Sequence, residues 1–185
     1  YGEDWARASV PQAILAVADL AFHPVTPTIV YASTGTTDYG SGMYKSIDGG
    51  ATWQRIGEGT EAISSVASIG IEPVAPYRVF VYSGGSEGGI WLSEDGGQEW
   101  ARANTPPGAD IQQIHFVPSD PPALYAASMG DVGGLYRSTD GAQTWSRAPG
   151  LLGEVQVYSL DSVTATDRGI LYAGTTGGRV EETSS

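Results

Sequence analysis

Carboxylates are the side chains in this sequence that offer the most chemistry. Three aspartates occur in copies of one pattern, Ser-x-Asp-Gly-x-x-x-Trp, which span Ser46–Trp53, Ser93–Trp100 and Ser138–Trp145 and are called boxes below. An Asp-x-Gly sequence invites a calcium site, but calcium needs several converging oxygen atoms and the pattern supplies one carboxylate per copy. We therefore predict that each aspartate accepts backbone N–H groups inside a turn. Calcium is the one alternative cofactor, and no other cofactor or metal is predicted. The positions that define the boxes are Ser46, Asp48, Gly49, Trp53, Ser93, Asp95, Gly96, Trp100, Ser138, Asp140, Gly141 and Trp145.

A second set of carboxylates, with one tyrosine, falls in the segments that connect the repeated strands. Two of them facing each other across a cleft would provide the acid and base of a glycoside hydrolase. We interpret them instead as a solvated acidic face that binds a basic peptide, a cation or a sugar. The residues of this predicted ligand face are Asp38, Tyr39, Glu58, Glu61, Glu87, Asp110, Asp131 and Glu154.

The remaining reactive side chains fit structural roles. His23 and His115 have no second histidine or cysteine at metal-ligand spacing. The sequence holds no nucleophile elbow and no phosphate-binding loop. Four arginines each follow a tryptophan by two residues, which indicates a repeat position rather than a clamp for a substrate carboxylate. These arginines are Arg7, Arg55, Arg102 and Arg147.

The elements that must position these residues repeat along the chain. The box serines recur after 47 and then 45 residues, and short aromatic or β-branched runs recur in step with them. Alternating apolar runs followed by Asp-Gly turns predict antiparallel hairpins. Strands are expected at 16–22, 29–33, 42–46, 52–56, 65–71, 78–83, 89–93, 99–103, 111–117, 123–128, 134–138, 144–148, 155–163, 170–174 and 178–183.

Four-stranded units at this period predict an all-β fold, a β-propeller of four-stranded antiparallel blades. We expect one domain over residues 1–185, with the fourth blade completed by residues 4–9, since Trp5-Ala6-Arg7-Ala8 matches the last strand of the other units. This strand would close a four-bladed ring. A longer propeller or a ring made by two chains remains open. The blades are expected at 12–57, 62–104, 110–149 and 155–185.

One residue departs from the repeat. An alignment without gaps places Asp161 in the column of Leu20, Ile69 and Ile114, on the innermost strand. A carboxylate there is costly unless it is paired or hydrated. Either the fourth unit is shifted in register, or Asp161 is a polar group that lines a central channel.

Composition excludes several classes of function. The 185 residues carry a net charge of −12, so the chain will repel nucleic-acid phosphates. It has no cysteine, so it forms no disulfide, and no apolar run long enough for membrane insertion.

The three boxes resemble the Asp-box, or BNR, repeat. Sialidases, xyloglucan-type glycoside hydrolases, sortilin-like receptors and photosystem II assembly factors share this repeat, and the resemblance covers nearly the whole chain. It implies a β-propeller and leaves function open, because enzymes and non-enzymes both use the repeat.

Together these observations favour a non-enzymatic binding or scaffold module, secreted or at the cell surface, whose partner is a protein or a glycan. A relative of a BNR-type glycoside hydrolase is the first alternative. A self-assembling subunit, joined through blade edges into a homo-oligomer, is the second.

Overall fold

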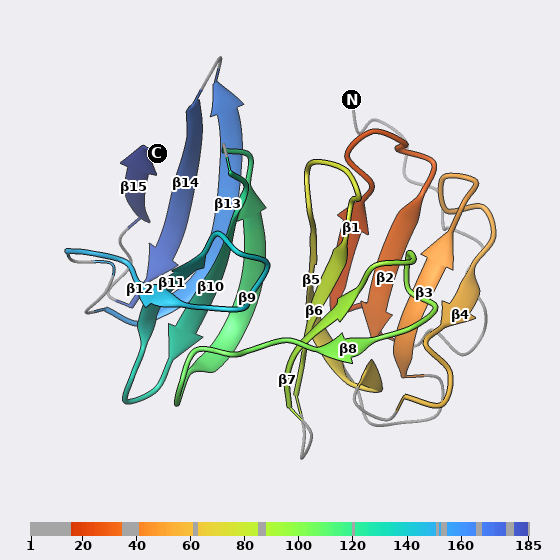
Figure 1. Ribbon diagram of the computed structural model, residues 1–185, viewed down its shortest axis with the longest axis horizontal. Helices are drawn as coiled ribbons and strands as arrows, with labels where there is room; N and C mark the ends of the chain where they lie inside the picture. Colours follow the sequence, from red (N-terminus) through yellow and green to blue (C-terminus); the bar gives the residue numbers. More distant parts are fainter. Residues whose placement is uncertain are drawn as a thin grey trace.

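The computed structural model describes residues 16–34, 41–60, 63–84, 88–119, 121–150, 152, 155–165, 168–176 and 180–184. These residues form fifteen β-strands in four antiparallel sheets and no α-helix (Figure 1). Each sheet follows the chain in a simple meander, in which every strand pairs with the next. The predicted all-β architecture of repeated antiparallel sheets is confirmed. In the described part of the chain, no helix is long and apolar enough to cross a membrane.

The strands lie close to their predicted positions. The first sheet holds β1 (Asp19–Phe22), β2 (Val30–Thr34), β3 (Gly42–Ser46) and β4 (Gln54–Ile56). The second holds β5 (Val66–Ile71), β6 (Val79–Ser83), β7 (Gly89–Ser93) and β8 (Ala101–Arg102). The third holds β9 (Asp110–Val117), β10 (Ala123–Met129), β11 (Gly134–Ser138) and β12 (Ser146–Arg147). The fourth holds β13 (Val157–Ala165), β14 (Arg168–Thr175) and β15 (Val180–Ser184).

Each box forms the turn between the third and fourth strands of its sheet. In the first box, the buried Ser46 hydroxyl donates to Asp48 (2.8 Å) and accepts the Gly50 N–H (2.8 Å). Asp48 in turn accepts the N–H and hydroxyl of Thr52. The second and third boxes repeat the serine–aspartate bond at 2.8 Å. The box carboxylates are therefore occupied by their own turns, which leaves them poorly placed to bind a ligand.

Hydrogen bonds within the turns also fix the charge of the box aspartates. Bonds from Thr52 and Ser46 lower the pKa of Asp48 to about 2, and bonds from Thr144 and Ser138 lower the pKa of Asp140 to about 2. Burial raises the pKa of Asp95, but the bonds from Glu99, Ser93 and Gln98 outweigh it and the pKa is lowered. All three carboxyls are thus ionised at neutral pH.

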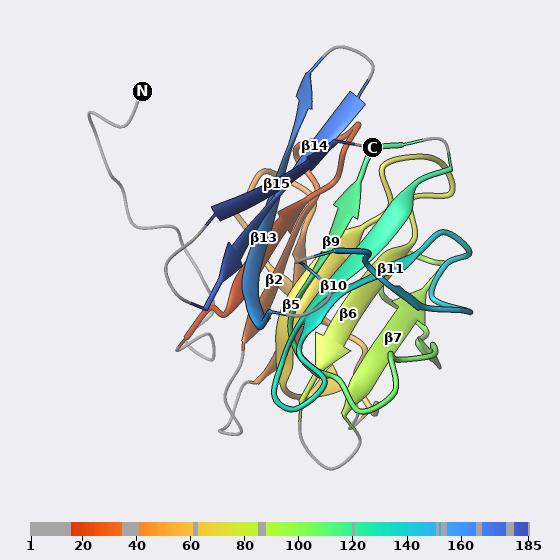
Figure 2. The same ribbon diagram turned by 90° about the vertical axis from the view of Figure 1, so that its left-hand side faces the viewer.

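Neighbouring sheets pack face to face through three buried clusters. The face that packs on the preceding sheet is called the front below, and the other face the back. The first strands of the sheets, β1, β5, β9 and β13, follow one another as the inner strands, each against the next (Figures 1 and 2). The clusters centre on Tyr31, Met43 and Ile69, on Phe80, Ile90 and Ile114, and on Tyr125, Leu135 and Leu160.

A hydrogen bond from one inner strand to the next recurs at each junction. The Ile69 N–H donates to the Asp19 carboxylate (2.8 Å), and the Ile114 N–H donates to the Ser68 hydroxyl (3.1 Å). At the third junction, the Leu160 N–H donates to the Gln113 side chain (2.7 Å). The acceptors occupy one repeat position, so a single column of polar side chains sets the register between sheets.

The fourth sheet is shifted by one residue relative to the gapless alignment. Asp161 pairs with Tyr172, whereas the residues that pair with the equivalent Tyr31 and Tyr125 are Ala21 and His115. Leu160, not Asp161, takes the buried position of Ile69 and Ile114. The alignment of Ala165 with the proline column is therefore wrong by one residue, because the β13–β14 hairpin contains one more residue than the other first hairpins.

The two ends of the row of sheets differ from its middle. Among the described residues, no strand of the fourth sheet packs extensively on a strand of the first. In this part of the chain β15 pairs only with β14, whereas the equivalent β3, β7 and β11 each pair with a fourth strand. The predicted closing strand at residues 4–9, with Trp5 and Arg7, lies outside the described residues, so ring closure stays a prediction.

Candidate functional site

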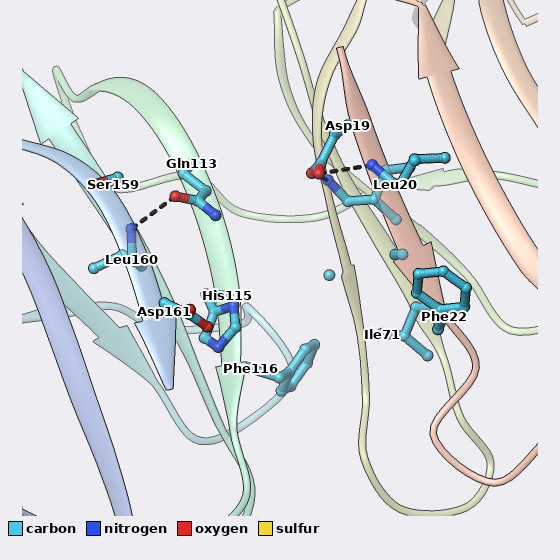
Figure 3. Close-up of a pocket in the computed structure, with 13 residues that line it drawn as sticks. Asp19, Leu20, Phe22, Ile71, Gln113, His115, Phe116, Ser159, Leu160 and Asp161 are labelled. Atoms are coloured by element: carbon cyan, nitrogen blue, oxygen red, sulfur yellow. Dashed lines mark hydrogen bonds between the residues drawn. The ribbon is translucent and has the colours of Figure 1, made fainter. Parts of the chain in front are cut away.

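A hollow of about 530 Å³ lies where the four inner strands meet. Figure 3 shows its two walls, with Asp19 and Phe22 of β1 on one side and Gln113, His115 and Asp161 of β9 and β13 on the other. Every inner strand contributes residues to it. The lining is Asp19, Leu20, Ala21, Phe22, Ile69, Gly70, Ile71, Gln113, His115, Phe116, Ser159, Leu160 and Asp161.

Two carboxylates give the hollow its charge. Asp19 is half-buried and is held by the N–H groups of Leu20 and Ile69, both at 2.8 Å. Asp161 is exposed and accepts the Ser162 N–H at 2.8 Å. No lysine or arginine belongs to the described lining of the hollow. Within the described lining, the negative charge of the hollow is therefore not neutralised by a cationic side chain.

His115 does not supply a compensating positive charge. Its Nε2 atom is hydrogen bonded to the Ser162 hydroxyl across the β9–β13 junction (2.8 Å). Burial lowers the pKa of His115, and the nearby carboxylates of Asp161 and Asp19 offset this only in part. The imidazole is therefore neutral at physiological pH and acts as a hydrogen-bonding group.

Apolar side chains form the rest of the hollow. Phe22 and Phe116 line it together with Ile71, and Figure 3 shows the two phenylalanines on opposite walls. Phe116 is buried and its ring meets the ring of Phe80 edge-on, with centroids 5.3 Å apart. An acidic site with apolar walls suits a cation on an apolar stem, such as a lysine or arginine side chain.

The described members of the predicted ligand face lie outside this hollow. Glu58 follows β4 in an exposed loop, where it borders a separate shallow pocket with Arg55 and Gln98. Asp110 opens β9 opposite Met129, which brings it near the exposed Asp131. No group of three residues capable of holding a metal ion comes together in the described chain. The other predicted members, Asp38, Tyr39, Glu61, Glu87 and Glu154, lie outside the described residues.

The repeated arginines are tied to the backbone. Arg55 donates to the Ser41 carbonyl (2.9 Å), Arg102 donates to the Gly88 carbonyl (2.9 Å), and Arg147 donates to the Gly133 carbonyl. Each therefore holds the residue that precedes the third strand of its own sheet. They form no clamp around a shared site, and Arg7 lies outside the described residues.

Sequence reasoning missed Asp19, Gln113 and the phenylalanines of the hollow. The signal for Asp19 and Gln113 was present, because they share a repeat column with Ser68 and this column is polar in all three strands. His23 does have a structural role, since its Nδ1 atom accepts the N–H groups of Val25 (3.3 Å) and Thr26 (3.1 Å). The sequence allowed either a register shift in the fourth unit or a polar lining role for Asp161. The fourth sheet is shifted in register, and Asp161 also lines the hollow.

Comparison with known proteins finds similar folds among solved structures. No protein-family model matches the sequence, and no curated protein matches it. Among solved structures, a GH74 enzyme from Niastella koreensis matches with a TM-score of 0.68 and 20% identity over 94% of this chain and 30% of that chain. A YCF48 bound to a D1 peptide matches with a TM-score of 0.60 and 14% identity over 91% of this chain and 53% of that chain. YCF48 from Cyanidioschyzon merolae matches with a TM-score of 0.56 and 13% identity over 92% of this chain and 56% of that chain.

This chain spans between about a third and just over half of the length of these structures. At such low identities the likeness concerns the arrangement of the strands and not the chemistry of a site. With the four meandering sheets and their inner strands, it shows that the chain has a β-propeller-type fold.

Proposed function

We propose that this chain is a non-catalytic binding module that takes a cationic segment of another protein into the hollow between its inner strands. One observation carries the proposal. The hollow holds the carboxylates of Asp19 and Asp161, and its described lining contains neither lysine nor arginine. A positively charged side chain would therefore enter a site whose charge complements its own.

The apolar walls of the hollow favour a cationic side chain that has an aliphatic stem. Lysine and arginine place an aliphatic stem behind the charged group, and Phe22, Ile71 and Phe116 offer apolar contact to such a stem. The net charge of −12 adds long-range attraction for a basic partner, which raises the rate of encounter at low salt. The likeness to a YCF48 that was solved with a peptide agrees with protein binding by a fold of this type.

The experiment compares two peptides that differ only in charge. A fluorescent peptide with one central arginine is titrated with the protein, beside the same peptide with citrulline, which keeps the shape of arginine and removes the charge. Asp19→Asn and Asp161→Asn each keep a hydrogen-bond acceptor and remove a carboxylate. We expect each variant to weaken arginine-peptide binding by about tenfold, the value of one charge-assisted contact.

Asp131→Asn serves as the matched control, since it removes an exposed carboxylate away from the hollow. It should change the affinity by less than about twofold, as expected for a screened surface charge. Equal binding of the citrulline peptide, or an equal effect of Asp131→Asn, would refute the proposal.

A glycoside hydrolase is the second candidate, because the GH74 enzyme has the highest TM-score of the three matches described above. Such an enzyme needs a carboxylic acid that stays protonated for general acid catalysis. The three box aspartates have lowered pKa values and cannot fill this role. Release of reducing sugar from a β-glucan, abolished by Asp19→Asn or Asp161→Asn, would support the hydrolase and displace the binding module.

A further inference from the structure

Each box contains an Asp-Gly pair, a sequence that is prone to a spontaneous rearrangement of the backbone. The backbone nitrogen of the glycine attacks the side-chain carboxyl of the aspartate, because glycine has no side chain that blocks the approach. The three boxes share one kind of turn, so their hydrogen bonds decide which pair reacts in the folded protein. The pairs are Asp48-Gly49, Asp95-Gly96 and Asp140-Gly141.

The first and third boxes hold both oxygen atoms of their aspartate. Thr52 donates its N–H to Oδ1 of Asp48 (2.8 Å) and its hydroxyl to Oδ2 (2.5 Å). Thr144 makes the same two bonds to Asp140, at 2.9 and 2.5 Å. The threonine hydroxyl is also the largest cause of the lowered pKa of each carboxyl, which is about 2 in both boxes. Such a carboxylate is a poor target for attack, since the loss of water requires the protonated group.

The second box has Glu99 at the position of the threonine and so lacks its hydroxyl. Oδ1 of Asp95 accepts the Ser93 hydroxyl (2.8 Å) and the Gln98 N–H (2.9 Å). Among the described residues, Oδ2 accepts only the Glu99 N–H, which the two oxygens share at 3.1 Å each. Burial works to raise the pKa of Asp95, against the hydrogen bonds that lower it. Of the three box carboxyls, the one of Asp95 is therefore held least firmly.

The attacking nitrogen also differs among the boxes. The Gly49 N–H donates to the Thr28 carbonyl (2.8 Å), which ties the first box to the turn before β2. Within the described chain, the N–H groups of Gly96 and Gly141 have no such acceptor. The first pair is therefore protected at both reacting atoms and the third pair at its carboxyl, whereas the second pair is fully protected at neither.

We propose that Asp95 is a site of spontaneous isomerisation to isoaspartate in the folded protein. The Gly96 nitrogen forms a bond to Cγ of the protonated Asp95 carboxyl. The Cγ–OH bond breaks, and the hydroxyl leaves as water with the proton of the N–H group. Water then opens the resulting succinimide ring. Opening at the backbone carbonyl breaks its bond to the Gly96 nitrogen, so the chain runs through Cβ and Cγ and the α-carboxylate is released.

The surroundings of Asp95 supply the one reagent that this reaction needs. Asp95 is exposed and lines a hollow of about 560 Å³ together with Glu94 and Glu99, so water reaches the succinimide from that side. Opening at the former side-chain carbonyl restores aspartate and also takes up one water molecule. Both outcomes therefore leave an oxygen atom of the solvent in the product.

The rearrangement weakens the contact between the first and second sheets. The Gly96 carbonyl accepts the Lys45 ammonium (3.0 Å) and the Tyr31 hydroxyl (3.3 Å). Lys45 and Tyr31 pair on adjacent strands and lie on the back of the first sheet. Isoaspartate adds one carbon atom to the backbone directly before Gly96 and so displaces this carbonyl. The modification thus acts on a junction between sheets and not only on an exposed turn.

The test measures the reaction at all three pairs in one sample. The folded protein is incubated at mildly acidic pH in water enriched in a heavy isotope of oxygen and is then digested with trypsin in ordinary water. Mass spectrometry counts one heavy oxygen for each succinimide that has opened, and fragment spectra place it on the aspartate. Three tryptic peptides contain one aspartate each, namely Ser46–Arg55, Val79–Arg102 and Ser138–Arg147.

We expect Asp95 to be labelled about three- to tenfold faster than Asp140, which is the effect of one hydrogen bond to a charged group at an exposed site. Asp48 should be labelled most slowly. Synthetic peptides with the same three sequences should be labelled at similar rates, since they lack the folded turn. Labelling of Asp95 no faster than that of Asp48 in the folded protein would overturn the inference. So would an equal preference for Asp95 in the peptides, because the preference would then come from the local sequence.

Two substitutions test the role of the threonine hydroxyl. Glu99→Thr supplies the hydroxyl that the second box lacks and should slow the labelling of Asp95 by about three- to tenfold. Thr144→Val removes the hydroxyl of the third box with little change in shape and should speed the labelling of Asp140 by a similar factor. Circular dichroism checks that both variants keep their β-sheets. Unchanged rates in both folded variants would contradict the proposed protection.

Discussion

The Ser93→Ala substitution tests whether the box serine, rather than the box aspartate alone, holds the turn. The Ser93 hydroxyl is buried between the third strand of its sheet and the box. It donates to the Asp95 carboxylate at 2.8 Å and accepts the buried Gly97 N–H at 2.7 Å. Alanine keeps the strand and fits the space, so the substitution removes these two bonds and little else.

The two lost bonds differ in cost. The Gly97 N–H loses its acceptor in a buried position, which costs about 1–3 kcal/mol. The bond to Asp95 involves a charged group but one that solvent screens, so it contributes about 1 kcal/mol at most. We expect the free energy of unfolding to fall by about 1–4 kcal/mol, and the melting temperature to fall by roughly 2–16 °C for a chain of this size.

Urea unfolding followed by tryptophan fluorescence and circular dichroism measures this loss. Ser64→Ala is the control, because Ser64 is exposed in the segment before β5, and it should change the free energy of unfolding by less than about 0.5 kcal/mol. An effect of Ser93→Ala as small as that of the control would refute the hydrogen-bond account of the box. A larger loss of unfolding free energy, with a changed dependence of that free energy on urea concentration, would mean that the substitution disrupts the second sheet and not only the turn.

Two further predictions concern acid stability and the packing between sheets. The folded pKa of Asp140, about 2, lies below the unfolded value, so its contribution to stability is present above about pH 4 and is lost as the pH falls toward 2. Asp140→Asn should therefore flatten the fall of the urea midpoint between pH 5 and pH 2.5, and an unchanged slope would contradict this assignment. Ile114→Ala removes a buried side chain between the second and third sheets and should lower the free energy of unfolding by about 2–5 kcal/mol. Ile47→Ala, at an exposed site, should cost less than about 0.5 kcal/mol in the same urea titration, and a similar loss for both variants would argue against the sheet packing.

Most of the strands could be predicted from the sequence because their signals are local. The third strands, β3, β7 and β11, begin and end at the predicted residues, since each starts at a glycine and ends at the serine that opens a box. The fourth strands are shorter than predicted. The residues predicted to begin them, such as Thr52 and Glu99, lie before the observed strands. They donate their N–H groups to the box aspartate and not to the neighbouring strand.

The fourth sheet was harder to predict because its repeat signals are weak. No proline marks the turn after β13, and a gapless alignment misses the additional residue in that hairpin. The pairing of Asp161 with Tyr172 corrects the register. The candidate site could not be predicted from local sequence signals either, since the hollow depends on which side chains of four separate strands face one another.

The sequence by itself determined the unit of this protein, a four-stranded meander closed by a Ser-Asp turn, because turn residues and alternating apolar runs act over a few neighbouring positions. Only the tertiary structure decided what surrounds each copy of that unit. Leu20 and Ile69 have the same repeat position and similar chemistry, yet one is exposed and the other buried. Burial depends on whether another sheet lies in front, and the residues of a single repeat carry no information about that neighbour.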